Sequence, residues 1–202
     1  GEVLALVSDA GMPLVSDPGQ RLVAACVEAG VAVTTVPGAS AVLSALALSG
    51  LAAEPFSFLG FLPSRAGERK RLLAQFLATP ATLICFESPH RIVDTLKELA
   101  ILAPARKVSM VREITKLHEE VLRGLAADVA AILAGRESVR GEVTLVIGPP
   151  ADEENRASES DIEAAIDEAL ASMPASQAAA HVAKALDLPK KDIYARILAR
   201  KG

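Results

Sequence analysis

The stretch VAVTTVPGASAVLSALALSG, residues 31–50, decides the fold class. Its first six residues are apolar or β-branched and predict a buried strand. Pro37-Gly38 ends this strand, and the Ala- and Leu-rich residues that follow predict a helix that stops at Gly50. A strand followed directly by a helix is the repeating unit of α/β proteins.

The residues before this stretch have the same order. Residues 3–7 form a continuous apolar run that predicts another buried strand. Asp17-Pro18 is typical of a helix start, and apolar residues at helical spacing follow it as far as Gly30. Strand, helix, strand and helix in succession predict a parallel sheet with helical crossovers.

The pattern begins again after residue 55. Further strands are predicted at 56–61, 81–86, 107–111, 119–123 and 142–147, and further helices at 67–78, 88–99 and 126–133. We divide the chain into a first α/β subdomain (1–52), a second α/β subdomain (53–150), a linker (151–160) and a small helical domain (161–202). Because the chain opens directly on a buried strand, we expect the first subdomain to be incomplete at its N-terminus.

Composition excludes several classes of protein. The 202 residues are 51% apolar, which is enough to build a core and excludes a disordered chain. Cys26 and Cys85 lie far apart, so we expect no disulfide framework and a cytoplasmic location. No apolar run is long enough to cross a membrane, and the three histidines lack the spacing of metal ligands, so we expect neither a membrane nor a metal site. The net charge of −4 argues against bulk nucleic-acid binding, although local basic patches remain compatible with it.

Polar clusters follow four of the predicted strands. They are Asp9-Ala10-Gly11, Pro37-Gly38-Ala39-Ser40, Glu87-Ser88-Pro89-His90-Arg91 and Arg112-Glu113-Ile114-Thr115-Lys116. Ligands of α/β sheets bind beyond the carboxyl ends of the strands, so the four clusters predict a single cleft. Several of these residues also have a purely structural interpretation. We favour helix capping for Ser40 and for the nearby Asp17, whereas a plain turn and a ligand loop have equal weight for Asp9-Ala10-Gly11. For the third cluster the structural interpretation is Ser88 as a helix cap and Glu87 with Arg91 as a surface ion pair.

Basic residues form two groups. One is Arg65, Arg69, Lys70 and Arg71, and the other is Lys190, Lys191, Arg196, Arg200 and Lys201. Either group could contact phosphates, but without a neighbouring cleft an ordinary solvated face is the favoured interpretation.

The ordered motifs resemble those of a known family. Residues 7–19, 37–41, 60–63, 87–91 and 112–116 look like the motifs of ribosomal RNA small subunit methyltransferase I, in the tetrapyrrole-methylase superfamily. The resemblance covers residues 1 to about 148, and the helical tail also suits the family. Met12 replaces a threonine of the family pattern. The family pattern begins with a further strand and loop that precede this chain, so we expect incomplete folding, weak donor binding or an inactive fragment.

The resemblance implies an activity and its partners. The family moves a methyl group from S-adenosylmethionine to the 2′-hydroxyl of a cytidine in the decoding region of 16S rRNA, within the small ribosomal subunit and without a metal. It also implies two α/β subdomains with the donor between them, and a homodimer. By correspondence of motifs, Asp9, Ala10 and Gly11 match the donor loop, and Pro37, Gly38 and Ser40 match the second loop of the donor site.

The sequence does not decide which side chain acts as the catalytic group. A ribose hydroxyl must lose a proton as it attacks, and the available polar groups are Glu87, Arg91, Glu113 and Lys116. A structural ion-pair network among these four has equal weight. Two rival functions also remain: a small-molecule methylase that acts on a tetrapyrrole, and a non-enzymatic RNA-binding or assembly module. The basic groups, Arg65 to Arg71 and the tail from Lys184 to Lys201, favour RNA as the substrate.

Overall fold

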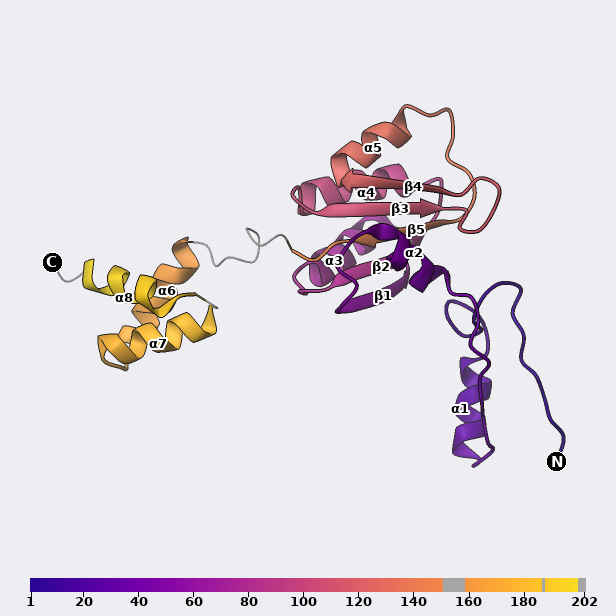
Figure 1. Ribbon diagram of the computed structural model, residues 1–202, viewed down its shortest axis with the longest axis horizontal. Helices are drawn as coiled ribbons and strands as arrows, with labels where there is room; N and C mark the ends of the chain where they lie inside the picture. The colour runs from indigo at the N-terminus through magenta and orange to yellow at the C-terminus, as the bar shows by residue number, and fades with distance from the viewer. Residues whose placement is uncertain (151–158, 187, 200–202) are drawn as a thin grey trace. The chain divides into compact units, whose positions relative to one another are not determined.

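The structure consists of two compact units. The computed structural model describes residues 1–150, 159–186 and 188–199, and the units separate after Pro150 (Figure 1). The predicted linker, 151–160, lies outside the described residues apart from its last two, which begin a helix. Arg200 and Lys201 also lie outside them.

The first unit contains a mixed five-stranded sheet. In chain order its strands are β1 (Phe56–Phe61), β2 (Thr82–Glu87), β3 (Lys107–Arg112), β4 (Glu120–Leu125) and β5 (Val143–Ile147). The spatial order is β1-β2-β5-β3-β4. Only β1 and β2 are parallel; β5 runs antiparallel to both β2 and β3, and β3 and β4 form an antiparallel pair. The sheet is mixed rather than parallel throughout, because the short β3–β4 connection holds no crossover helix and these two strands pair antiparallel.

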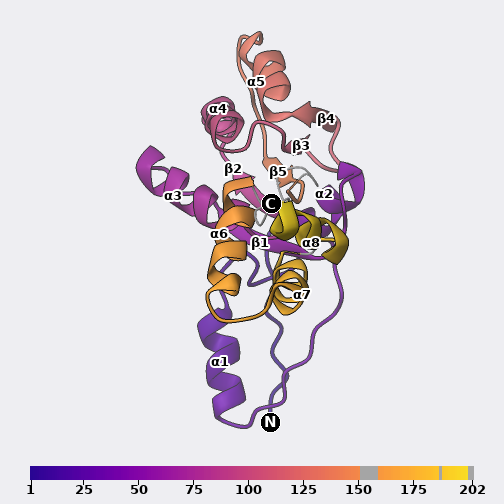
Figure 2. The same ribbon diagram turned by 90° about the vertical axis from the view of Figure 1, so that its left-hand side faces the viewer.

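Helices cover both faces of this sheet (Figure 2). They are α2 (Ala41–Ser49) on one face and α3 (Ala66–Leu77), α4 (Ile92–Leu102) and α5 (Ala126–Ala134) on the other. Successive residues of a strand point to opposite faces, so Leu83 and Cys85 pack in the larger core whereas Ile84 packs under α2. Burial raises the pKa of the Cys85 thiol, which is an inert core group.

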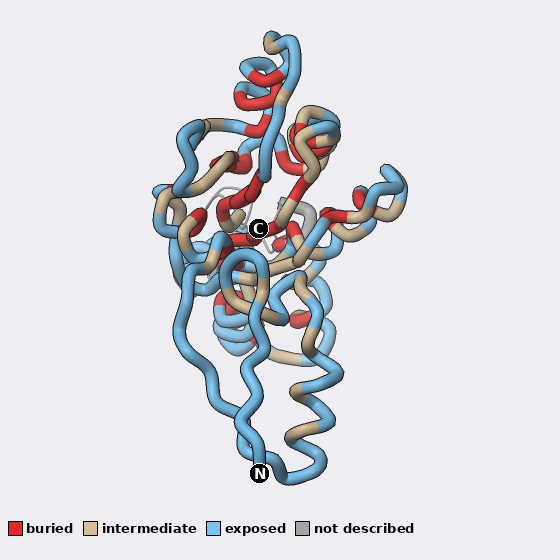
Figure 3. Tube along the Cα trace, turned by 90° about the vertical axis from the view of Figure 1, so that its right-hand side faces the viewer, coloured by how far each residue is buried: buried red, intermediate tan, exposed pale blue. Residues whose placement is uncertain are grey.

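Two predicted strands do not form. Residues 3–7 and 31–36 carry no strand hydrogen bonds, and Val3 is fully exposed. Both segments lie in exposed stretches of the chain (Figure 3). The predicted helix between them does form as α1 (Gln20–Glu28), yet it buries none of its residues. A strand exists only by pairing with a neighbour, and the described residues supply none here.

The ends of α2 are fixed as the sequence predicts. The Ser40 side chain accepts a hydrogen bond from the Leu43 N–H, and Gly50 ends the helix with φ 71°. In addition, Arg123 of β4 donates to the carbonyl groups of Leu48 and Ser49. These contacts fasten α2 to the sheet and so fix the position of its N-terminus.

An ion-pair cluster joins β3 and β4 to the residues that precede β5. The Glu120 carboxylate accepts hydrogen bonds from Arg136 and from Arg112. The bond from Arg136, reinforced by Arg112, holds the pKa of Glu120 at about 2. Arg112 also donates to the Arg140 carbonyl, at 3.1 Å, which ties the end of β3 to the loop before β5.

The second unit is a three-helix bundle. Its helices are α6 (Glu159–Leu170), α7 (Ala175–Ala185) and α8 (Lys190–Ala199), as the apolar spacing predicts. A core of its own includes Ile166, Val182, Ile193 and Ile197. Over the described part of the chain, every helix is too short or too polar to span a bilayer.

Candidate functional site

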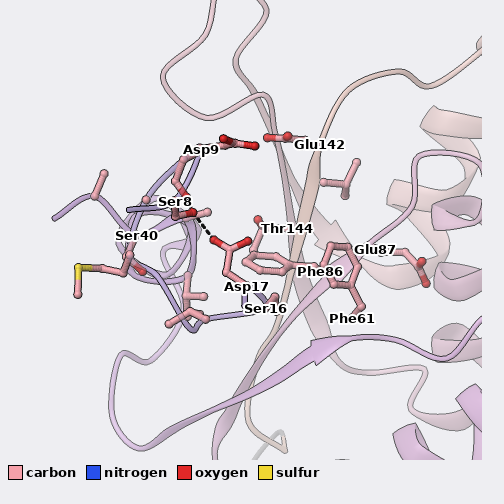
Figure 4. A pocket seen from close by; sticks show the side chains of 18 of the residues that line it. Ser8, Asp9, Ser16, Asp17, Ser40, Phe61, Phe86, Glu87, Glu142 and Thr144 are labelled. Atoms are coloured by element: carbon pink, nitrogen blue, oxygen red, sulfur yellow. Dashed lines mark hydrogen bonds between the residues drawn. The ribbon is translucent and has the colours of Figure 1, made fainter. Parts of the chain in front are cut away.

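A cavity of about 570 Å³ lies at one edge of the sheet in the first unit (Figure 4). Its walls are parts of the loop 8–17, residues 39–42 at the start of α2, the ends of β1 and β2, and residues 141–144 at the start of β5. Because β5 is antiparallel to β2, with Glu87 opposite Val143, the end of one strand and the start of the other meet at this edge.

The predicted donor loops lie together at the cavity. Asp9, Ala10, Gly11 and Ser40 line it, whereas Pro37 and Gly38 lie outside the lining. The two loops touch, because a Cβ atom added at Gly11 would lie 3.0 Å from the Ala39 carbonyl oxygen. Gly11 also has φ 73°, a conformation that side chains disfavour. The donor-binding role of these residues stays a prediction.

Asp17 does not cap a helix, so that interpretation is wrong. The N-cap of α1 is Gly19, with no side-chain cap. Instead, the Asp17 carboxylate accepts a hydrogen bond from the Ser8 hydroxyl and lines the cavity (Figure 4). Left-handed backbone at Leu14 and Ser16 turns the loop back on itself, so its two ends meet.

Apolar groups and carboxylates line different parts of the cavity. The rings of Phe61 and Phe86 lie 5.2 Å apart between centroids and form an aromatic wall. Across the cavity, the carboxylates of Asp9 and Glu142 point toward one another (Figure 4). Sequence reasoning missed Glu142, because it considered the residues that follow strands and not those that precede one. Only the antiparallel direction of β5 brings Glu142 to this edge.

Two of the catalytic candidates form a structural ion pair. The Glu87 side chain is buried, and its oxygens accept hydrogen bonds from the Ser88 N–H, the Arg91 guanidinium and the Thr95 hydroxyl. In Figure 4 it lies on the side away from Asp9. Both oxygens of this buried carboxylate are engaged by neighbouring donors, so the geometry favours the structural interpretation for Glu87 and Arg91.

The other two candidates form a separate cluster. Lys116 Nζ lies 3.0 Å from Glu113 Oε1 and 3.0 Å from Glu142 Oε2. Neither Glu113 nor Lys116 lines the cavity itself. Hydrogen bonds from the Glu142 N–H and from Lys116 hold the pKa of Glu113 below its ordinary value. The bonds that Lys116 donates to Glu113 and to Glu142 raise the pKa of Lys116. The four candidates therefore do not form one network.

Three of the four predicted phosphate contacts at the start of α3 face solvent. Arg65 is exposed beside Glu68, and Lys70 and Arg71 are exposed. Arg69 is 4% exposed and donates two hydrogen bonds to Glu98, so it does not present its charge to a ligand. We correct the prediction for Arg69, whose guanidinium is a structural group. Over the residues described, no cluster of His, Cys, Asp and Glu has the size to hold a metal ion.

Comparison with known proteins identifies the class. Residues 1–130 match the family described as Tetrapyrrole (Corrin/Porphyrin) Methylases, and residues 156–201 match one described as RsmI C-terminal HTH domain. A crystal structure of uroporphyrin-III C-methyltransferase from Thermus thermophilus, complexed with S-adenyl homocysteine, is 26% identical. It has a TM-score of 0.46 and covers 68% of this chain and 62% of its own.

Sequence relatives narrow the class. Ribosomal RNA small subunit methyltransferase I of Mesorhizobium japonicum is 42% identical over the whole chain, and that of Neisseria meningitidis serogroup A is 40% identical. The chain spans 68% and 70% of these two proteins, and 50% of the relative from Halalkalibacterium halodurans, with which it is 46% identical. The chain belongs to the ribosomal RNA small subunit methyltransferase I family, a methyltransferase family within the tetrapyrrole methylases. The resemblance found in the sequence motifs is thus confirmed.

Proposed function

We propose that this chain belongs to an enzyme that transfers a methyl group from S-adenosylmethionine to 16S rRNA in the small ribosomal subunit. The acceptor is the 2′-hydroxyl of a cytidine in the decoding region. The observation that carries the proposal is the cavity in which the Asp9-Ala10-Gly11 loop meets residues 39–42. We also propose a cytoplasmic homodimer, on the resemblance alone.

The chemistry of the cavity fits this donor. Its volume, about 570 Å³, is within the range of small-molecule sites. Hydroxyl groups of Ser40 and Thr144 can bond a ribose, and the Phe61–Phe86 wall can pack against a planar base. The carboxylates of Asp9 and Glu142 suit positively charged groups. These three kinds of group suit a nucleoside that carries a sulfonium and an ammonium charge.

The protein contributes mainly by alignment. S-adenosylmethionine, when bound, supplies a methyl group that is electrophilic enough for a hydroxyl oxygen to attack. Gly11 lets the two loops approach closely, and the Ser8–Asp17 hydrogen bond fixes the shape of the first loop. Holding the hydroxyl in line with the methyl group provides much of the rate enhancement.

RNA recognition requires local cations, because the chain as a whole is negative. The exposed cations of α3 are Lys70 and Arg71, with Arg65 just before the helix. In the second unit Lys184, Lys190 and Lys191 are exposed, and Arg196 lies 3.8 Å from Glu163. We assign the phosphate contacts to these two surfaces. The match of the second unit to a domain described as HTH supports its share of the role.

Reversing both charges in Lys70→Glu/Arg71→Glu is expected to weaken binding to small ribosomal subunits by about tenfold at low salt and to flatten the salt dependence by about two units of slope. Donor affinity should not change. Filter binding against salt concentration and calorimetry with the donor measure the two effects. The control is Lys107→Glu, an exposed cation at the opposite edge of the sheet. Unchanged subunit binding would show that these cations are ordinary solvated groups that do not contact the RNA.

A tetrapyrrole methylase is the second candidate, because the family matched by residues 1–130 is described by that substrate. The two candidates differ in the acceptor. The protein is incubated with labelled donor and either purified small subunits or a porphyrinogen. Label in the RNA supports the proposed function, and label in the porphyrinogen alone would replace it.

A further inference from the structure

The loop between β3 and β4 is bonded to the segment that enters β5. The Glu113 N–H donates to the Glu142 carbonyl at 3.0 Å, and the Glu142 N–H donates to Glu113 Oε1 at 2.9 Å. Lys116 then bridges the two carboxylates. The two segments are thus joined through both backbone and side chains, although they are far apart in the sequence.

Gly141 makes this arrangement possible. It has φ 89°, and a Cβ atom at this position would lie 2.5 Å from three atoms of the Glu113 side chain. Only a glycine leaves room for Glu113 to lie across the segment. Consequently, the Glu113 side chain fixes the backbone of Gly141 and Glu142, and both of these residues line the cavity.

The result is a carboxylate held at the cavity wall. The Glu142 side chain is 85% exposed, so without a partner it would sample many rotamers. Lys116 restricts it, and Figure 4 shows it directed toward Asp9 across the cavity. Asp9 itself makes no hydrogen bond to the described residues through its side chain. A positive group between Asp9 and Glu142 would meet negative charge on two sides.

We propose that Glu142 binds a positively charged group of the methyl donor, and that Glu113 and Lys116 are positioning residues that hold Glu142 for this purpose. The inference rests on the proposed function and assigns roles within its site. Glu113 and Lys116 then act without touching the donor.

Calorimetry with two probes tests the role of Glu142. S-adenosylmethionine carries positive charge, and 5′-methylthioadenosine is a neutral nucleoside that shares its adenosine. Glu142→Gln is expected to lower affinity for the first by roughly 5- to 20-fold, the size expected of one partly screened charge pair, and to leave affinity for the second unchanged. Glu137→Gln is the control, since it removes an exposed carboxylate from the loop that leads to Glu142.

Lys116 gives the sharper test, because the two possible roles have opposite signs. If Lys116 merely neutralised Glu142, then Lys116→Met would raise affinity for S-adenosylmethionine. If it positions Glu142, the same change lowers that affinity, and Lys116→Arg, which keeps the ion pair, restores most of it. Unchanged or raised affinity in Lys116→Met overturns the positioning role.

The remaining outcomes are also decisive. Equal losses for both probes in Glu142→Gln, or no loss for either, overturn the inference while leaving the proposed function intact. If the wild-type protein binds neither probe, the proposed function is contradicted, and this inference is contradicted with it. The thermal unfolding midpoint of each variant shows whether a loss of affinity reflects a loss of fold.

Discussion

Replacing Gly11 with valine is expected to abolish donor binding while the sheet stays folded. Gly11 has φ 73°, which a β-branched residue strongly disfavours, and its Cβ would lie 3.0 Å from the Ala39 carbonyl oxygen. That oxygen belongs to the backbone and cannot rotate away. One of the two loops must therefore shift, which distorts the wall of the cavity that both form. We expect a loss of more than about 100-fold in affinity for S-adenosylmethionine by calorimetry, equivalent to about 3 kcal/mol.

A matched variant distinguishes the effect of backbone strain at a positive-φ glycine from the effect of crowding between the two loops. Gly30 also has positive φ, 69°, but no atom lies within 4 Å of the position its Cβ would occupy. Gly30→Val therefore introduces the same backbone strain away from the cavity, and it should bind the donor as the wild type does. Normal binding by Gly11→Val, or equal losses in both variants, would contradict the assignment of the donor loop.

Replacing Glu87 with alanine is expected to destabilise the first unit by about 3–5 kcal/mol, the usual cost of removing one member of a buried ion pair. Arg91, Thr95 and the Ser88 N–H would all lose their acceptor. Urea unfolding measures the change. Glu68→Ala is the control: its exposed pair with Arg65 should contribute less than about 1 kcal/mol.

The same variant decides between the two interpretations of Glu87. If the Glu87 carboxylate is structural, its replacement lowers the stability of the first unit. Methyl transfer then falls only as far as the folded fraction falls. If the variant keeps wild-type stability but loses methyl transfer, Glu87 is a catalytic candidate again and its structural interpretation is wrong.

Local sequence patterns were sufficient for most elements. The predicted strand at 56–61 has the same bounds as β1, and the helix predicted at 67–78 differs from α3 by one residue at each end. Apolar periodicity and turn residues act within a few positions, so they can be read from sequence. The strands predicted at 3–7 and 31–36 failed because a strand also requires a partner, which no local pattern supplies.

Local sequence patterns likewise predicted only part of the site. Polar residues after the predicted strands at 3–7 and 31–36 pointed to the Asp9-Ala10-Gly11 loop and Ser40, which line the cavity although neither strand forms. Arg69 and Glu142 did not follow from such patterns. Whether an arginine in an amphipathic helix faces Glu98 or solvent depends on how α3 packs on α4, and Glu142 reaches the cavity only because β5 is antiparallel to its neighbours.

The decisive measurement is the position of the transferred methyl group. Small ribosomal subunits are incubated with the protein and methyl-labelled S-adenosylmethionine, and the 16S rRNA is digested and mapped by mass spectrometry. We predict label on the ribose of one cytidine in the decoding region, where the methylated 2′-oxygen also blocks alkaline cleavage of the adjacent phosphodiester. Label on a base, label elsewhere in the rRNA, or an unlabelled rRNA with a protein that binds the donor normally would contradict the proposed function.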